Sequence, residues 1–394
     1  MGVTDADERR RRTKKGSIKD PMAASALLVV ASLVSPALAA YRSEYRPHTT
    51  APFGGARMSL SSVRSLNSTV SSLPSNFSWA EVNGTSMLTK VLNQHLLQYC
   101  GSCWAFAALS ALQDRIKIAR GGAGTEIQLS MQHVLNCGTA GTCNGGNQIE
   151  VYSWAYSISL LGSGIAYESV NPYYACSPGN PSGRGATSEG FCPSRAVQQG
   201  TTCEPINIAR NCATFGSPCT ALSHYPNATI TAYGMVAGEA QIMDEVYRSG
   251  PVACSVDAEP LVQYTGGILR QGRTPSRTNH VVSIVGWGES EGVRYWIVRN
   301  SWGEPWGEMG FFRVERGLNL LNLEEDCSWA QPGTFTTTLD HPCWEDGANC
   351  VAGVPSPSNS TGPYGGYAYG EEEEKHAAKG GSKVVKAARG VLAP

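Results

Sequence analysis

The chain has 394 residues, of which 41% are hydrophobic and 16% charged, a composition that excludes wholesale disorder and allows a full hydrophobic core. The net charge is -1, and no basic stripe with interleaved aromatic residues occurs, so nucleic-acid binding is not expected. All 13 cysteines lie at or after Cys100. This number is too high for an ordinary cytosolic enzyme, and because it is odd, a disulfide framework leaves at least one thiol unpaired.

Residues 1–40 are predicted to be a basic leader and signal peptide. The apolar stretch Met22–Ala40 follows a basic segment and closes on Ala37-Leu38-Ala39, as in a cleavable secretory signal. A retained signal anchor is the alternative, but the serines and the proline within the stretch favour cleavage near Ala39 or Ala40. We therefore expect the secretory pathway, with the lysosome, vacuole or extracellular space as destination, and no stable membrane association after signal removal.

The remaining chain divides by composition. Residues 41–72 read as a short pro-segment, and residues 73–335 as the globular domain, which is mildly acidic. Within that domain, residues 177–220 form an insertion rich in glycine, proline, serine and cysteine. Residues 336–394 are predicted to be a disordered tail that holds at most one small disulfide loop. Secretion makes five glycosylation sequons available: Asn67, Asn76, Asn83, Asn227 and Asn359.

Helical spacing of apolar residues predicts a helix over Cys103–Arg120, ended by two glycines, and a second helix over Ala240–Ser249, ended by Gly250-Pro251. The segments that follow are β-branched and aromatic and are separated by glycine-rich turns, which predicts an antiparallel sheet or barrel: VACSV, HVVSIVGW, RYWIVRN and MGFFRVE. A helical half followed by a β half is typical of an α+β fold with two lobes and a cleft between them.

Cys103 begins the first predicted helix. A thiol at a helix N-terminus faces unpaired N–H groups and the positive end of the helix dipole, both of which favour the thiolate. We therefore predict that Cys103 is a nucleophile. Acyl transfer by a thiolate also needs an imidazole to carry the proton, a group to orient that imidazole and a donor for the developing oxyanion.

Other residues could supply these groups. Of seven histidines, His280 is the best-placed base, because it opens an apolar strand; a buried structural histidine is the ordinary alternative. Asn300 follows the strand YWIVR and could hold the imidazole tautomer while Trp302 covers that bond from water. Gln94 could donate its amide to the oxyanion, and Gln98 is the alternative donor.

Cys100 and Cys103 also form a C-x-x-C pair, for which a thioredoxin-like redox site is the main rival interpretation. That site requires a parallel βαβ context and a cytosolic setting, and the sequence indicates neither. We expect Cys100 to be structural.

Four motifs in order resemble the papain family of cysteine proteases over residues 73–335: Cys100-Gly-Ser-Cys103-Trp-Ala, Cys143-Asn-Gly-Gly146, Asn279-His280-Val-Val and Tyr295-Trp-Ile-Val-Arg-Asn300-Ser-Trp-Gly. The resemblance implies a two-lobed papain-like fold, with a helical N-terminal lobe, an antiparallel β-barrel-like C-terminal lobe and the active site in the cleft. It implies that Cys103, His280 and Asn300 are catalytic and that Gln94 and the Cys103 N–H form the oxyanion hole. Gly145 and Gly146 would pair with an extended substrate backbone.

The segment that follows Gln94 is similar to the cathepsin X (cathepsin Z) branch of this family. The string His95-Leu96-Leu97 looks like a three-residue insertion, and in that branch a histidine of the equivalent loop reaches the C-terminal carboxylate of the substrate. His95 is the candidate here. The branch also has a pro-segment cysteine that caps the active-site thiol, whereas this chain has Glu44-Tyr45-Arg46-Pro47 in the matching place. Latency would then have to be steric.

Twelve cysteines are expected to be structural. The family pattern implies Cys137 with Cys176 and Cys254 with Cys327, and we expect Cys100 to pair with Cys143. Proximity in sequence suggests the remaining pairs, although sequence alone does not determine connectivity: Cys192 with Cys203, Cys212 with Cys219, and Cys343 with Cys350.

The sequence thus predicts a cysteine-type peptidase that acts on peptides and proteins through an acyl-enzyme and removes single C-terminal residues. A papain-like endopeptidase and a catalytically silent cysteine-rich binding protein are the alternatives. No zinc-ligand spacing occurs, so neither a metal nor another cofactor is expected. We expect a monomer.

Overall fold

The computed structural model describes residues 43–48, 73–177, 201–214, 219–270, 277–339 and 342–351. The α-helices in this part of the chain are α2 (Cys103–Ala119), α3 (Met131–Cys137), α4 (Gln148–Leu160), α6 (Pro205–Ile208) and α7 (Glu239–Ser249). The strands are β1 (Phe77–Ser78), β2 (Gly141–Thr142), β3 (Gly145–Gly146), β4 (Ile165–Ala166), β5 (Arg210–Asn211), β6 (Thr220–Ala221), β7 (Asn227–Val236), β8 (Val252–Val256), β9 (Ile268–Leu269), β10 (His280–Ser290), β11 (Val293–Arg299), β12 (Phe311–Glu315) and β13 (Cys327–Phe335).

The first predicted helix forms as α2, with Arg120 as its C-cap. Gly121 and Gly122 follow with φ of 63° and 77°, a left-handed conformation that ends a helix. Every residue from Cys103 to Ile116 is buried. A helix buried on all sides lies inside a core rather than on its surface, so α2 provides a rigid base for its first residue.

The strands from β7 onward join β4 in a nine-stranded sheet of order β4-β7-β13-β8-β10-β11-β12-β9, in which β1 also pairs with β10. Neighbouring strands are antiparallel except β12 and β9, which are parallel. The predicted α+β class is confirmed. The described strands do not close into a barrel, because β4 and β9 remain at opposite ends of the sheet.

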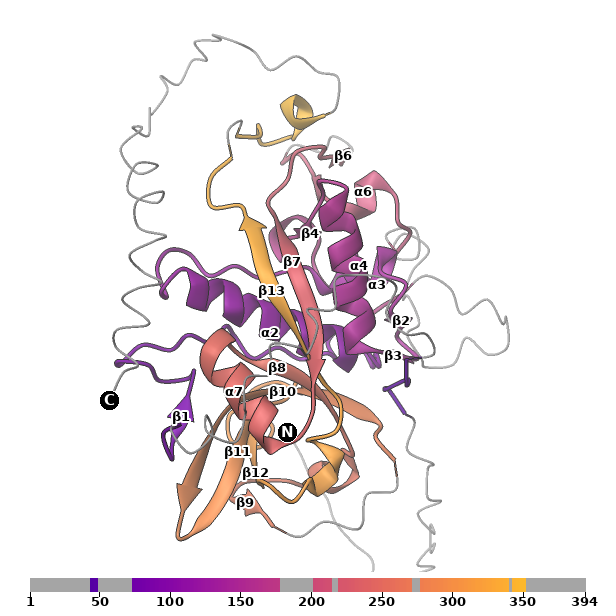
Figure 1. Ribbon diagram of the computed structural model, residues 1–394. Coiled ribbons are helices and arrows are strands. Elements are labelled where there is room, and N and C mark those ends of the chain that lie inside the picture. Colours follow the sequence, from indigo (N-terminus) through magenta and orange to yellow (C-terminus); the bar gives the residue numbers. More distant parts are fainter. Residues whose placement is uncertain are drawn as a thin grey trace, which may run out of the picture. The chain divides into compact units, whose positions relative to one another are not determined.

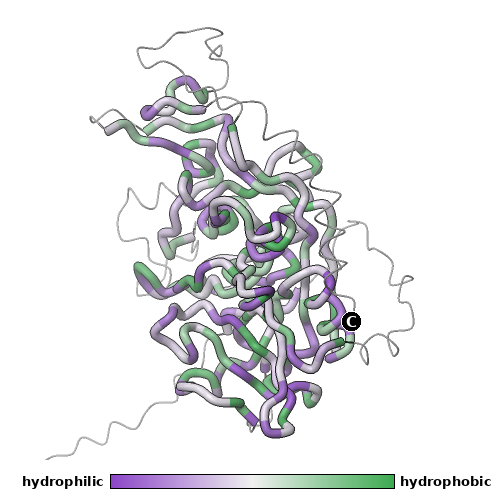
Figure 2. Tube along the Cα trace, turned by 90° about the vertical axis from the view of Figure 1, so that its left-hand side faces the viewer, coloured by the Kyte–Doolittle hydropathy of each residue, from purple (hydrophilic) through white to green (hydrophobic). Residues whose placement is uncertain are grey.

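Two hydrophobic clusters fill the space between these elements. One gathers around α2, α3 and α4, and the other lies where β8, β10, β11 and β12 meet α7. Figure 1 shows the long β7–β13 pair with α4 beside β7 and α2 running across the pair. Hydrophobic and hydrophilic stretches alternate along the chain in Figure 2, as expected where most elements turn one face to the core.

The disulfides correct one part of the prediction. Cys137 pairs with Cys203, so the expected Cys137–Cys176 and Cys192–Cys203 pairs are wrong. Beyond Cys203 the chain turns back as α6 onto the end of α3, and there the Asn136 amide donates to the Asn207 carbonyl at 3.0 Å. Cys176 is disulfide-bonded as well, and Cys192 lies outside the described residues.

Four of the predicted disulfides are present: Cys100–Cys143, Cys212–Cys219, Cys254–Cys327 and Cys343–Cys350. The last of these closes a small loop in what we expected to be a disordered tail. Residues 342–351 instead pack against the insertion and the residues just after it. There Ser223 donates its N–H to the Cys350 carbonyl at 2.8 Å, and Cys350 is buried with Ala209 and Leu222.

Among the described helices, none is both long enough and hydrophobic enough to cross a membrane. The apolar stretch of residues 22–40 lies outside the described part of the chain.

Candidate active site

Cys103 is the first residue of α2 and is fully buried. The Cys100–Cys143 disulfide holds the chain just before it, and the Gly101 N–H donates to the Cys143 carbonyl at 2.8 Å. The Trp104 indole donates to the Gly101 carbonyl at 3.0 Å. These contacts fix the N-terminus of α2. Within the described part of the chain, Cys103 is the cysteine that carries a free thiol.

His280 and Asn300 come together from neighbouring strands. His280 opens β10, Asn300 follows β11, and the His280 Nε2 atom lies 2.8 Å from the Asn300 Oδ1 atom. The Ser301 N–H donates to the same Oδ1 atom at 2.8 Å, which orients the Asn300 amide. The Trp302 ring lies 5.0 Å from the His280 ring and covers this pair, as the sequence predicted.

The two candidate oxyanion donors occupy different places. Gln94 is fully buried, and its Oε1 atom accepts from the Ser301 hydroxyl at 2.7 Å, which turns its Nε2 atom toward the start of α2. That Nε2 atom donates to the Cys100 carbonyl at 3.0 Å. Gln98 donates its amide to the Ala175 carbonyl at 3.1 Å instead. Gln94 is therefore the amide that lies beside Cys103.

The segment of residues 43–48 lies against the predicted substrate-binding glycine of β3. The Gly146 N–H donates to the Glu44 carbonyl at 3.0 Å, and the Arg46 N–H donates to the Gly146 carbonyl at 2.9 Å. On its other edge, the Glu44 N–H donates to the Asn279 carbonyl at 2.8 Å. The segment thus forms the kind of backbone pairing that we predicted for a substrate.

Close contacts leave no room for a side chain on either glycine of β3. A Cβ atom on Gly145, which has φ of +103°, would lie 2.8 Å from the Glu44 carbonyl oxygen. A Cβ atom on Gly146 would lie 2.5 Å from the Ala140 carbonyl oxygen and 2.6 Å from the Trp104 ring. A side chain at position 145 would therefore displace the paired segment, whereas one at position 146 would displace the Trp104 ring or the backbone around Ala140, just before β2.

The Glu44 carboxylate is the residue that sequence analysis missed. Its Oε2 atom accepts from Gln94 Nε2 at 3.0 Å and lies 3.2 Å from His280 Nδ1. Its backbone carbonyl oxygen lies 3.9 Å from the Cys103 sulfur. The resemblance placed Glu44 where the related branch has a cysteine that caps the active-site thiol, but it did not predict that the carboxylate contacts residues 50 and 236 positions away.

The pKa values of Cys103 and Glu44 are shifted in opposite directions in this site. Burial raises the pKa of the Cys103 thiol well above its ordinary value, and the Glu44 carboxylate raises it further. Burial alone would also raise the pKa of Glu44, but the hydrogen bond and charge of His280, with smaller effects of Tyr99 and His95, lower it overall. The backbone N–H of Trp104, at the start of α2, lowers the pKa of the thiol as expected, but burial and the Glu44 charge outweigh this effect. In this arrangement the Glu44 carboxylate lies beside His280, and the shift in the pKa of Cys103 favours the thiol over the thiolate.

His95 lies on the loop between Gln94 and Cys100. Its ring stacks on Tyr99 with the ring centroids 4.9 Å apart, and its Nδ1 atom is buried without a hydrogen-bond partner in the described part of the chain. Burial lowers the pKa of His95, while the Glu44 charge acts in the opposite direction. The next two residues are exposed, Leu96 by 61% and Leu97 by 77%.

A second buried histidine and a cluster of three possible metal ligands could also be taken for functional groups. His133 is buried in α3, accepts from the Ala166 N–H at 3.0 Å and has a pKa lowered to about 4 by burial, so it is structural. The Glu44, Cys103 and His280 donor atoms lie within 4.8 Å of one another, close enough to hold a metal ion. Their hydrogen bonds to one another and to Gln94 account for the arrangement without one.

A buried ion pair supports the site from behind. Asp114 of α2 pairs with Arg299, the residue before Asn300, and both side chains are almost completely buried. Asp114 also accepts from the N–H and the hydroxyl of Thr89, each at 2.8 Å. The pair ties the helix that carries Cys103 to the strand that carries Asn300. Arg299 stands in the motif that ends in Asn300-Ser-Trp-Gly, but Asp114 stands in no motif, so their pairing was not predicted.

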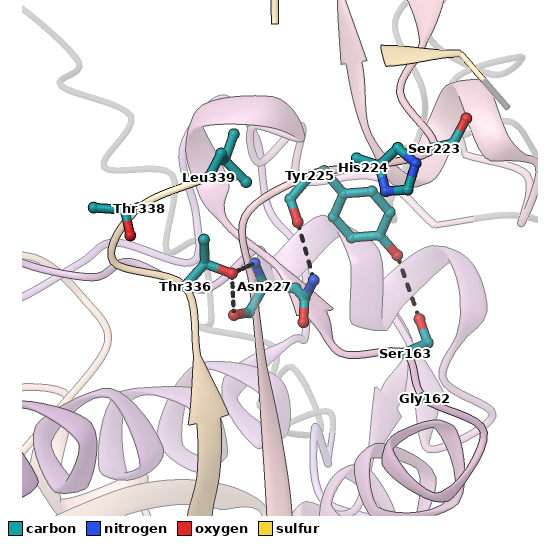
Figure 3. A pocket seen from close by; sticks show the side chains of 9 residues that line it. All are labelled: Gly162, Ser163, Ser223, His224, Tyr225, Asn227, Thr336, Thr338 and Leu339. Atoms are coloured by element: carbon teal, nitrogen blue, oxygen red, sulfur yellow. Dashed lines mark hydrogen bonds between the residues drawn. The ribbon is translucent and has the colours of Figure 1, made fainter. Parts of the chain in front are cut away.

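A pocket in the described part of the chain is lined by Gly162, Ser163, Ser223, His224, Tyr225, Asn227, Thr336, Thr338 and Leu339 (Figure 3). None of the predicted catalytic residues lines it.

The amide nitrogen of the sequon residue Asn227 donates to the Tyr225 carbonyl at 2.9 Å. Asn76 and Asn83 are exposed and are better placed for a glycan. The sequon residues Asn67 and Asn359 lie outside the described residues.

Comparison with known proteins agrees with this geometry. The sequence profile of the papain family cysteine proteases matches residues 73–333. This chain belongs to the papain family. The match spans every residue of the site except the segment of residues 43–48.

Individual relatives span the same region. The chain is 37% identical to cathepsin Z of Onchocerca volvulus over 270 residues, which is 66% of this chain and 78% of that protein. It is 34% identical to cathepsin B-like cysteine proteinase 5 of Caenorhabditis elegans over 57% of this chain and 65% of that protein. Among solved structures, digestive procathepsin L2 from the Tenebrio molitor larval midgut superposes with a TM-score of 0.53 at 25% identity, covering 74% of this chain and 78% of that one.

Proposed function

We propose that this papain-family cysteine peptidase is a carboxypeptidase that removes single residues from the C-termini of peptides, with Cys103 as nucleophile. The observation that carries the proposal is the joint position of Cys103, His280, Asn300 and Gln94 beside a loop that presents His95. The likeness to cathepsin Z of Onchocerca volvulus supports the narrower activity. The chain requires no cofactor for this reaction.

The chemistry follows from the four side chains. Once Glu44 has left, Cys103 transfers its proton to His280, and the thiolate attacks the carbonyl carbon of the scissile peptide bond. Gln94 Nε2 and the Cys103 N–H stabilise the oxyanion. His280, oriented by Asn300, then protonates the leaving amine, and a water molecule hydrolyses the thioester with His280 as general base.

His95 supports exopeptidase action. An imidazole beyond the scissile bond donates a hydrogen bond or a positive charge to a free C-terminal carboxylate, and an amidated C-terminus lacks that anionic partner. Because burial lowers the pKa of His95, the ring gains its charge only in acid, so the preference for a free carboxylate strengthens as the pH falls.

The segment of residues 43–48 is part of a pro-segment that keeps the enzyme latent. Its Glu44 carboxylate accepts from the amide of Gln94, which substrate would need for its oxyanion, and it pairs with His280 in place of the thiolate. The Glu44 carbonyl faces Cys103, but its oxygen accepts from the Gly146 N–H rather than from Gln94, so it is not activated for attack. Latency is therefore polar as well as steric.

One experiment tests the activity directly. Two peptides that differ only in a free or an amidated C-terminus are incubated with the full-length protein at acidic pH, and the products are identified by mass spectrometry. We expect stepwise loss of single residues from the free peptide and at least about tenfold slower loss from the amidated one. His95→Ala should reduce this difference to about twofold, and Gln98→Ala, on the same loop, is the matched control.

The other outcomes are equally informative. Internal cleavage of both peptides at equal rates would reject the carboxypeptidase and favour an endopeptidase. No cleavage, together with no labelling of Cys103 by a thiol-reactive epoxide, would reject the proposed catalytic role of this residue.

A further inference from the structure

Three side chains that meet at the start of α2 each carry an atom that can bind a metal ion: a Glu44 carboxylate oxygen, the Cys103 sulfur and a His280 ring nitrogen. These atoms lie within 4.8 Å of one another. In a tetrahedral zinc site, bonds of about 2.0–2.3 Å hold neighbouring ligand atoms about 3.3–3.6 Å apart, so each atom needs to move by only about 1 Å. The Glu44 Oε2 and His280 Nδ1 atoms are already 3.2 Å apart.

The hydrogen bonds around this set prepare it for an ion. The Asn300 Oδ1 atom accepts from the Ser301 N–H at 2.8 Å, so it is an acceptor, and it lies 2.8 Å from His280 Nε2. His280 therefore carries a proton on Nε2 and can offer the lone pair of Nδ1. Gln94 donates to the Glu44 carboxylate at 3.0 Å and so fixes its direction. Metal ligands are usually held from behind in this way, and loss of such a partner typically weakens binding by about 10–100-fold.

Burial and charge favour a doubly charged cation with affinity for sulfur. Cys103 is 0% exposed, His280 2% and Glu44 8%. A thiolate and a carboxylate balance the two charges of the ion and the imidazole is neutral, so the complex brings no net charge into a buried place. Burial raises the pKa of the Cys103 thiol, but a thiol that coordinates a metal loses its proton outright. Thiolate and imidazole ligands select zinc, whereas magnesium and calcium prefer oxygen.

We propose that Glu44, Cys103 and His280 form an inhibitory zinc site in the full-length protein, where the ion covers the nucleophile and ties the segment of residues 43–48 to it. Within the described residues no fourth histidine, cysteine, aspartate or glutamate belongs to the group, so water takes the fourth position. Binding releases the thiol proton of Cys103, and any proton on His280 Nδ1, to solvent. Because the ligands come from three distant segments, the sequence shows no zinc-ligand spacing.

The consequence for activity rests on the peptidase function proposed above, whereas the binding itself does not. When the segment of residues 43–48 leaves, the ion keeps only Cys103 and His280 as ligands, and its affinity falls. Zinc therefore strengthens latency in the full-length protein more than it inhibits the activated enzyme.

The first test measures metal binding without turnover. Full-length protein, purified without thiol reductant so that its disulfides stay intact, is titrated with Zn²⁺ in competition with a chromophoric chelator. We expect one tight site with a dissociation constant below about 1 µM. Glu44→Gln should weaken binding by at least about 100-fold, because a carboxylate ligand is lost. Glu81→Gln, at an exposed acid, is the matched control and should stay within about twofold of the parent.

Co²⁺ in place of Zn²⁺ identifies the sulfur ligand, because a cobalt–thiolate bond gives a charge-transfer band in the near ultraviolet. We expect this band in the parent and its loss in Cys103→Ser. Equal affinity of Zn²⁺ for the parent and Glu44→Gln, or a cobalt complex of the parent without the band, would overturn the proposal.

The second test asks whether the ion covers the nucleophile. Zn²⁺ at about ten times its dissociation constant should slow epoxide alkylation of Cys103 by about tenfold in the full-length protein at pH 7. The same concentration should change the rate by less than about twofold in Glu44→Gln, and Mg²⁺ should change neither. An unchanged rate in the parent would contradict the site.

The two proposals fail separately. If Zn²⁺ binds and protects Cys103 while the released enzyme cleaves no peptide, the peptidase proposal is at fault and the zinc site stands. If peptides are cleaved and Zn²⁺ does not bind through Glu44, the zinc site is wrong and the peptidase proposal stands.

Discussion

Two regions of the molecule use cysteine in opposite ways. At the start of α2, Cys103 is buried, unpaired and surrounded by polar side chains that can take or give a proton. In the region where residues 205–222 meet residues 342–351, cysteines instead close two loops with a separation of 7 residues each. Among the described residues, the hydrophobic cluster there has three buried members, Ala209, Leu222 and Cys350.

The difference shows what decides the role of a cysteine. A region with so small a core gains stability from cross-links, whereas α2 lies in a large core and needs none at its first residue. Cys103 is left free for chemistry because its neighbours already hold the helix in place. Substitutions in the two regions should therefore separate activity from stability.

The largest effect is expected at Cys103 itself. Cys103→Ala should lower kcat by at least about 10⁴-fold, because no other group forms the acyl-enzyme, while the melting temperature changes by no more than a degree or two. Peptide hydrolysis and thermal unfolding of the same preparations check this. Retained hydrolysis would remove Cys103 from the mechanism, and a large drop in melting temperature would make it structural.

A disulfide in the core of the sheet should show the reverse pattern. Cys254 and Cys327 join β8 to β13 across 73 residues, and replacing both by serine should cost about 4 kcal/mol of unfolding free energy. Replacing Cys343 and Cys350, which close 7 residues, should cost about 2 kcal/mol. Denaturant unfolding measures both, and activity per labelled active site should not change. Equal losses would contradict the loop-length argument.

The buried ion pair behind the site should couple stability to activity. Asp114→Asn leaves Arg299 with an unbalanced buried charge and should destabilise the fold by about 3 kcal/mol. Because Arg299 precedes Asn300, kcat should fall as well. Asp244→Asn, at the exposed i,i+4 pair with Arg248, is the control and should cost less than about 0.5 kcal/mol. An unaffected Asp114→Asn would show that the pair contributes nothing to the site.

The smallest effect is a pH dependence at Glu44. Since the pKa of Glu44 is lowered in the folded protein, its contacts are fully present above the ordinary glutamate value and are lost as the pH falls through the lowered pKa. Glu44→Gln should therefore speed alkylation of Cys103 by about tenfold at pH 7. The ratio to the parent should approach one only as the pH falls below the ordinary glutamate pKa and through the lowered pKa of Glu44. A ratio that does not change with pH would mean that the segment of residues 43–48 blocks the site by its bulk alone.

Local sequence motifs predicted the catalytic residues and the regular elements that carry them. Cys103, His280 and Asn300 stand in short strings whose chemistry is readable because each begins or follows one regular element, and α2 and the β10–β11 pair form where periodicity placed them. Gln94 was separated from Gln98 only by the structure, since both are amides on one loop and their partners lie far along the chain.

Contacts between distant, irregular segments were not predictable. Glu44 and His280 are separated by 236 positions, and nothing in the composition of the pro-segment encodes the contact. The same holds for Tyr45 with Asp326, which are 281 positions apart. The Cys137–Cys203 pair was missed because the insertion folds back through the short helix α6, whereas family pattern and proximity in sequence favoured other partners.

The most direct test of the account is epoxide labelling of the full-length protein, followed by peptide mapping of every cysteine. The account predicts one adduct, on Cys103, that forms slowly at pH 7 and rapidly once the segment of residues 43–48 is released in acid, while the disulfide-bonded cysteines stay unlabelled. Cys103 found in an intrachain disulfide of the active protein, or an adduct on any other cysteine, would contradict it.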